Sequence, residues 1–126
     1  MIVFQTRIGI KCPAEEVFAY ISDPRNLPAW NSAVQAVRPT SPAANGAGST
    51  FSMKRELPSG PAINQLEVIA SKPPRKFTIR TTAGPTPLLY RYQFAAQDGE
   101  TVVRLDAQVE LDGVATLLAQ LARRAV

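Results

Sequence analysis

The sequence predicts an α+β fold in which one curved antiparallel sheet of about seven strands packs against a C-terminal helix. Three observations predict it. A proline-started acidic helix follows the first strand, an apolar helical stretch occupies residues 114–126, and most of the chain between them alternates with period two. With 126 residues, the chain has the length of one domain, and we expect a single domain over residues 1–126.

The first strand and the helices after it have clear local signals. Residues 2–10 alternate, with the apolar set on the even positions, which predicts a half-buried strand. Pro13 suits the first turn of a helix, and Glu15 and Glu16 favour the positive end of its dipole. Asp23 and Pro24 repeat that start signal and predict a second short helix running to about Trp30.

Strands separated by turn residues fill the middle of the chain. The expected strands are 33–38, 49–57, 63–71, 76–82, 88–96 and 101–111. Residues 58–61 are predicted to form a turn, and Asp98-Gly99 is a strong hairpin signal between the last two strands. These spacings predict an antiparallel meander.

The last residues predict an amphipathic helix. Asp112 can cap it, and Val114, Leu117, Leu118 and Leu121 share one side at helical spacing. Thirteen residues from 114 to 126 make a helix roughly 20 Å long. Whether this helix is complete is left open by the sequence.

Composition restricts the classes of binding partner and the cellular location that we expect. The 14 basic and 10 acidic residues give a net charge of +4, but the cations are spread along the chain, so we expect no nucleic-acid partner. Neither a long apolar run nor a signal-peptide pattern is present, which predicts a cytoplasmic protein without a transmembrane segment. A monomer and a homodimer are both compatible with the sequence.

Several kinds of catalytic site are excluded by residue types. The chain has no histidine, so it cannot build a Ser-His-Asp triad, a Cys-His pair or a zinc site that uses histidine. We interpret the single cysteine, Cys12, as a small structural residue. The acidic residues suggest no paired-carboxylate site, and Gly46-Ala47-Gly48 does not lead into a helix as a phosphate loop would. We therefore expect no catalytic residues, no metal and no cofactor.

Two segments resemble a known superfamily. One is the stretch 12–18, Cys-Pro-Ala-Glu-Glu-Val-Phe, and the other is 23–31, Asp-Pro-Arg-Asn-Leu-Pro-Ala-Trp-Asn. With the element order, they resemble the helix-grip (SRPBCC) superfamily of START domains and pollen allergens, and most closely its polyketide cyclase/dehydrase-like members. The resemblance implies a cavity between the sheet and the C-terminal helix that holds a small hydrophobic ligand such as a polyketide, lipid or isoprenoid.

Strand alternation identifies the side chains that would face such a cavity. The predicted ligand-binding set combines the inward positions of the strands with Trp30 and one residue of the last helix. Its members are Trp30, Phe51, Met53, Arg55, Leu66, Val68, Phe77, Ile79, Thr81, Leu88, Tyr90, Tyr92, Val103, Leu105 and Leu118.

The polar members of this set allow two interpretations. Arg55, Tyr90 and Tyr92 could orient a phenol, carbonyl or carboxylate of a ligand, because buried polar groups need partners. In the simpler interpretation, Arg55 reaches solvent near Pro58 and the tyrosines reach solvent at the rim of the cavity. For Arg55 we favour this simpler interpretation.

Three functions stay open at this point. A binding or carrier module for an apolar molecule needs only a continuous cavity. An aromatase/cyclase-type enzyme would use Arg55, Tyr90 and Tyr92 for orientation and enolate stabilisation. A protein-interaction module would have a filled core and dock through the last helix or a sheet edge on a partner or a membrane surface, for which Arg123-Arg124 is weak support. We expect the first.

Overall fold

The computed structural model describes residues 2–30, 34–42, 46–57, 60–85 and 87–109. The predicted C-terminal helix, including Leu118, and the end predicted for the last strand lie outside these residues. None of the described helices is long and apolar enough to cross a lipid bilayer.

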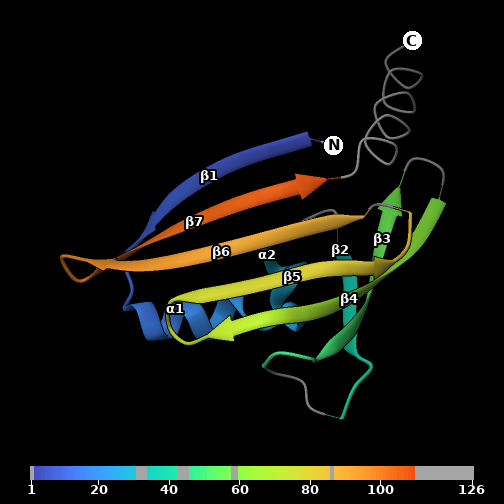
Figure 1. Ribbon diagram of the computed structural model, residues 1–126, viewed down its shortest axis with the longest axis horizontal. Helices are drawn as coiled ribbons and strands as arrows, with labels where there is room; N and C mark the ends of the chain where they lie inside the picture. The colour runs from blue at the N-terminus through green and yellow to red at the C-terminus, as the bar shows by residue number, and fades with distance from the viewer. Residues whose placement is uncertain (1, 31–33, 43–45, 58–59, 86, 110–126) are drawn as a thin grey trace.

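Seven strands form one antiparallel sheet in the order β1-β7-β6-β5-β4-β3-β2, with three short helical segments between β1 and β2 (Figure 1). The elements in chain order are β1 (Ile2–Ile10), α1 (Ala14–Ile21), the 3-10 helix η1 (Pro24–Asn26), α2 (Leu27–Trp30), β2 (Val34–Pro39), β3 (Thr50–Leu57), β4 (Gly60–Lys72), β5 (Lys76–Ala83), β6 (Leu88–Gln97) and β7 (Glu100–Val109).

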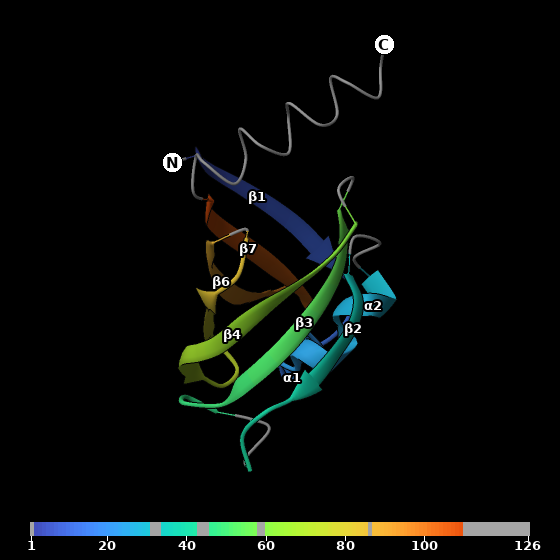
Figure 2. The same ribbon diagram turned by 90° about the vertical axis from the view of Figure 1, so that its right-hand side faces the viewer.

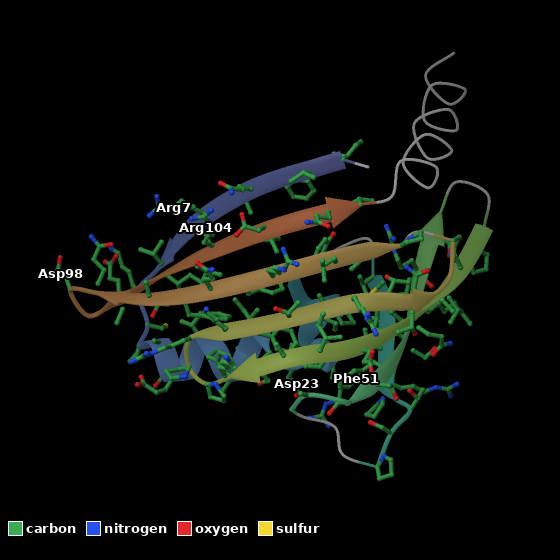
Figure 3. All side chains as sticks on the ribbon, in the orientation of Figure 1. Arg7, Asp23, Phe51, Asp98 and Arg104 are labelled. Atoms are coloured by element: carbon green, nitrogen blue, oxygen red, sulfur yellow. The ribbon has the colours of Figure 1, made fainter. Side chains whose placement is uncertain are left out.

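The turn expected over residues 58–61 overlaps the start of β4. Gly60 and Pro61 belong to β4, where Pro61 pairs with Glu56. A proline is tolerated there because it lies near the first residue of the strand. The β6–β7 hairpin agrees with its signal: Asp98 and Gly99 form the tip with φ of 53° and 77°, and Asp98 is at the far end of the hairpin in Figure 3.

Curvature gives the sheet a concave and a convex face (Figure 2). Register shifts interrupt the β2–β3 pairing once and the β4–β5 pairing twice, and such bulges bend a strand and increase its twist. The segments α1, η1 and α2 lie on the concave side (Figures 1 and 2), where α1 contacts β6 and β7 and where η1 and α2 contact β2. The helical segments therefore cover only part of this face.

Two hydrogen bonds hold the helical segments in place. The Asp23 carboxylate accepts the backbone N–H of Arg25 at 3.1 Å, which caps η1 as the sequence predicts. Thr101, fully buried at the start of β7, donates its hydroxyl to the Cys12 carbonyl oxygen at 2.7 Å and so joins β7 to the β1–α1 connection.

The core lies on the concave face beneath these segments. Phe51 and Val68 are the largest of its fully buried apolar side chains, at 0% and 1% exposure. Phe18 of α1 packs edge-on against Phe94 of β6 with ring centroids 5.2 Å apart. The alternation read from the sequence thus identifies the buried face of β3 to β7.

Candidate ligand-binding site on the concave face

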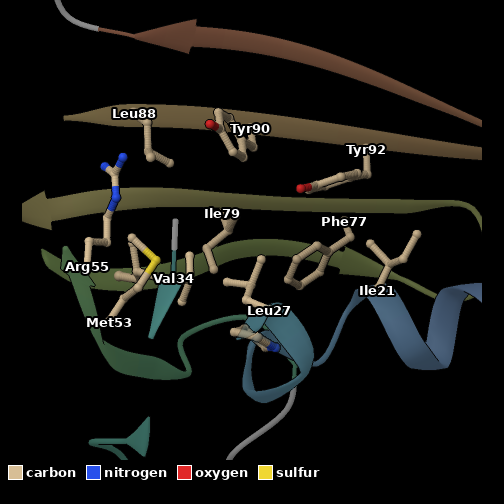
Figure 4. Close-up of a pocket in the computed structure, with 12 residues that line it drawn as sticks. Ile21, Leu27, Val34, Met53, Arg55, Phe77, Ile79, Leu88, Tyr90 and Tyr92 are labelled. Atoms are coloured by element: carbon tan, nitrogen blue, oxygen red, sulfur yellow. The ribbon is translucent and has the colours of Figure 1, made fainter. Parts of the chain in front are cut away.

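A small cavity of about 60 Å³ lies between the sheet and the helical segments (Figure 4). It is the more enclosed of two apolar spaces on this face, and we call it the closed cavity. Its lining comes from α1, η1, α2 and β2 to β6: Ile21, Pro24, Leu27, Val34, Met53, Arg55, Leu66, Phe77, Ile79, Leu88, Tyr90 and Tyr92. Its wall is mostly apolar.

The polar atoms of the closed cavity come from three side chains. In Figure 4 Arg55 reaches from β3 toward β6, and the hydroxyls of Tyr90 and Tyr92 point to the side on which Arg55 lies. Burial raises the pKa of the Tyr90 hydroxyl, and the nearby Arg55 charge partly opposes this effect. Burial, and next the proximity of Tyr90, raise the pKa of Tyr92 as well. Both phenols are therefore neutral hydrogen-bond donors at neutral pH.

Arg55 is half-buried, and within the described part of the chain no carboxylate forms an ion pair with it. Its guanidinium can therefore donate to a carbonyl, phenolate or carboxylate of a molecule in the closed cavity. The chemistry available at this end is hydrogen-bond donation and orientation, because the lining includes no carboxylate.

A second, open groove of about 720 Å³ lies on the other part of the concave face. We call it the open groove. It is lined by side chains of β1, α1, β6 and β7 and of the β1–α1 connection: Thr6, Ile8, Ile10, Cys12, Glu16, Val17, Tyr20, Ile21, Tyr92, Val103 and Leu105. Tyr92 and Ile21 line both spaces, so they form the partition between the closed cavity and the open groove.

The residues expected to bind ligand fall into four groups in the structure. Met53, Arg55, Leu66, Phe77, Ile79, Leu88, Tyr90 and Tyr92 line the closed cavity. Val103 and Leu105 line the open groove instead. Phe51 and Val68 are packed in the core, and Thr81 buries a hydroxyl that makes no hydrogen bond to the described residues. The Trp30 side chain and Leu118 lie outside the described part.

The sequence reasoning missed four residues that line the closed cavity: Ile21, Pro24, Leu27 and Val34. It also missed seven that line the open groove: Thr6, Ile8, Ile10, Cys12, Glu16, Val17 and Tyr20. Two signals were available: Val17, Tyr20 and Ile21 lie three and four residues apart in the helix that starts at Pro13, and the even positions of residues 2–10 alternate. The predicted set drew its strand positions from residues 51–105 and therefore left out the first strand, the helical segments and β2.

Comparisons with known proteins agree with this arrangement. The family model described as polyketide cyclase / dehydrase and lipid transport matches residues 1–126. A START superfamily protein from Mycobacterium smegmatis superposes with a TM-score of 0.72 at 13% identity, covering 96% of this chain and 92% of that one. For the major latex-like protein 151 of Panax ginseng, the TM-score is 0.71 at 12% identity, with 96% and 92% covered.

The di-domain ARO/CYC protein of the steffimycin biosynthetic pathway also superposes. Its TM-score is 0.69 at 13% identity, over 95% of this chain and 42% of that one. A search of curated protein sequences finds no match. At these identities the solved structures establish the fold alone.

Proposed function

Because the chain belongs to the polyketide cyclase/dehydrase and lipid transport family, we propose that it binds a small hydrophobic molecule on its concave face. The observation that carries the proposal is the pair of apolar spaces that meet at Tyr92 and Ile21. The closed cavity, at about 60 Å³, is far below the roughly 300–1,000 Å³ of ligand sites. The ligand therefore lies mainly in the open groove, with a polar end near Arg55 and Tyr90.

The proposal includes a cover for the open groove. The stripe of Val114, Leu117, Leu118 and Leu121 is apolar, and so is the groove wall at Ile8 and Leu105. A helix over residues 114–126 would bury both surfaces from water. Burial of apolar surface is the main driving force for such packing. We propose that this helix packs over β1 and β7 and completes the binding site.

The first experiment is native mass spectrometry of the purified protein, followed by denaturing extraction of any bound molecule. A stoichiometric apolar molecule supports the proposal and identifies its chemical class. An empty protein that also binds no apolar fluorescent probe such as 1-anilinonaphthalene-8-sulfonate contradicts it, and favours the protein-interaction module if the protein self-associates through its concave face.

A matched pair of substitutions locates the site. Ile8 lines the open groove, and Val3, on the same strand, faces the opposite side of the sheet, where it pairs with Gln108. Ile8→Trp is expected to weaken probe binding at least tenfold by filling the groove, whereas Val3→Trp leaves it unchanged. Equal effects of the two substitutions would place the probe elsewhere.

One observation favours a second candidate function, an aromatase/cyclase-type enzyme. Arg55 and Tyr90 both line the closed cavity, and the Arg55 charge opposes the burial that raises the pKa of the Tyr90 hydroxyl, so a carbonyl oxygen held between them would accept hydrogen bonds from both as an enolate forms. The test is turnover of a poly-β-ketone thioester by the wild type and by Arg55→Leu and Tyr90→Phe. An enzyme loses rate in both variants while binding persists; a carrier shows no turnover in any of them.

A further inference from the structure

The convex face of the sheet carries a row of cations set by strand register. Arg7 of β1 is opposite Arg104 of β7, Arg104 is opposite Gln93 of β6, and Gln93 is opposite Lys76 of β5, which is in turn opposite Lys72 of β4. Residues directly opposite in antiparallel strands point to the same face. At about 4.8 Å between strands, the row extends about 19 Å. We call Arg7, Arg104, Lys76 and Lys72 the basic row.

The basic row is incompletely neutralised by the protein itself. Within the described part of the chain, only Arg104 of the row has an ion pair, to Asp106 at 3.3 Å. Arg7 and Arg104 are directly opposite each other and adjacent in Figure 3, an arrangement of like charges that destabilises a sheet. Elsewhere on the surface Arg80 pairs with Glu67 and Arg25 with Asp23. A plain solvated face would not need to place its cations together.

An open hollow beside the basic row adds a further cation. Arg7, Lys76 and Arg104 border it together with Arg75, and Glu15 is the single carboxylate among its lining residues. The hollow thus presents excess positive charge to solvent and extends the charged surface from the row toward α1.

The surroundings of the row restrict the kind of partner. The described residues of the convex face include no aromatic side chain. Single-stranded bases therefore have nothing there to stack on, and the aromatic residues that commonly dominate binding at protein interfaces are missing. A broad sheet face also does not enter the major groove of duplex DNA, which admits a helix or a two-stranded ribbon. A bilayer with anionic headgroups requires neither anchors nor shape complementarity, only several Lys and Arg near its surface.

From these observations we infer that the basic row docks the protein on a phospholipid bilayer rich in anionic headgroups. The convex face lies against the headgroups, and the concave face with its two apolar spaces points away from them. This inference does not depend on the proposed ligand. It concerns the opposite face of the sheet and would hold for a protein that binds nothing in the cavity.

The test is co-sedimentation of the full chain with vesicles of phosphatidylcholine containing 30% phosphatidylserine, against vesicles of phosphatidylcholine alone, at low ionic strength. We expect binding to the anionic vesicles only, with loss at 0.5 M salt because the charges are exposed. Each cation near the surface contributes roughly a fivefold change in partitioning, so Lys72→Gln/Lys76→Gln should lower it about 25-fold.

The control removes the same charge from another region. Lys11 in the β1–α1 connection and Arg25 in η1 are exposed on the side of the sheet that carries the helical segments, and Lys11→Gln/Arg25→Gln should leave partitioning nearly unchanged. Circular dichroism melting checks that both variants are folded, and all four substituted side chains are exposed. Absence of vesicle binding, equal losses in the two variants, or binding to polyglutamate or duplex DNA in place of vesicles would overturn the inference.

Discussion

The two halves of the concave face differ although their sequences alternate in the same way. Under α1, η1 and α2, the inward residues of β3 to β6 are buried, with Phe51 at 0% exposure and Ile79 at 5%. On β1, inward Ile8 is 59% exposed, and Phe4 is 43% exposed. Alternation selects which face of a strand is apolar, but a second layer decides whether that face is removed from water.

This contrast divides the proposed binding site into a covered and an uncovered half. The covered half already has core packing and a small cavity, whereas the uncovered half presents an apolar groove next to the edge strand β1. Large exposed apolar patches on a folded protein mark sites where something binds. The difference is the reason for assigning most of the ligand, and the cover over it, to the half at β1 and β7.

The largest expected effect tests the covered half. Phe51→Ala removes a ring with no exposed surface and leaves a cavity, so the free energy of unfolding should fall by about 3–5 kcal/mol. Urea denaturation measures it. A loss below about 1 kcal/mol would show that the covered half is loosely packed.

The second effect tests the proposed cover of the open half. Ile8 and Val3 are on the same strand at 59% and 63% exposure, but Ile8 lines the open groove and Val3 does not. If residues 114–126 cover the groove, Ile8→Asp buries a carboxylate and costs about 1–3 kcal/mol more than Val3→Asp. Matching denaturation midpoints for the two variants would mean that the groove is open in solution.

The third effect tests the partition between the halves. Burial raises the pKa of Tyr92, so the folded state keeps its proton when the unfolded chain begins to lose it near pH 10. The resulting stabilisation is complete below pH 10 and is lost as the pH rises toward the folded-state pKa. Between pH 8 and pH 11 the wild type should lose about 1 kcal/mol more stability than Tyr92→Phe.

If Tyr92→Phe follows the wild-type pH dependence, Tyr92 is open to solvent and does not separate the closed cavity from the open groove.

The smallest effect concerns the segments that cover the closed half. Asp23→Ala removes the cap of η1 and should cost about 1 kcal/mol. Hydrogen bonds from the Arg25 side chain lower the pKa of Asp23, so this contribution is present above about pH 4 and is lost as the pH falls below it. The wild type and variant should therefore differ at pH 7 and converge near pH 2; a constant difference would assign the effect to packing.

Most of the fold was predictable from local signals. Period-two alternation, the Asp98-Gly99 turn and the Asp23-Pro24 start each depend on a few neighbouring residues and agree with the structure. The inclusion of Gly60 and Pro61 in β4 was not predicted, since a proline reads as a turn unless its strand position is known. The C-terminal helix stays a prediction.

The site was less accessible to sequence reasoning. Alternation correctly separated inward from outward residues on β3 to β6. It did not predict which inward residues are packed in the core and which line a cavity or groove. The burial of Phe51 and the exposure of Ile8 depend on where α1 and α2 lie relative to the curved sheet, which is a long-range property. The alternation of residues along a strand carries no information about where the helices lie.

The pairing of β1 with β7 has a consequence for synthesis on the ribosome. β1 emerges before the other described strands, but its one sheet neighbour among them is the last, β7, and the Thr101–Cys12 hydrogen bond that fixes their junction joins residues 89 apart. Until β7 has left the exit tunnel, the nascent chain holds an apolar strand without a partner. Such a strand is a target for aggregation or for a chaperone, so translation speed late in the message should influence the yield of folded protein.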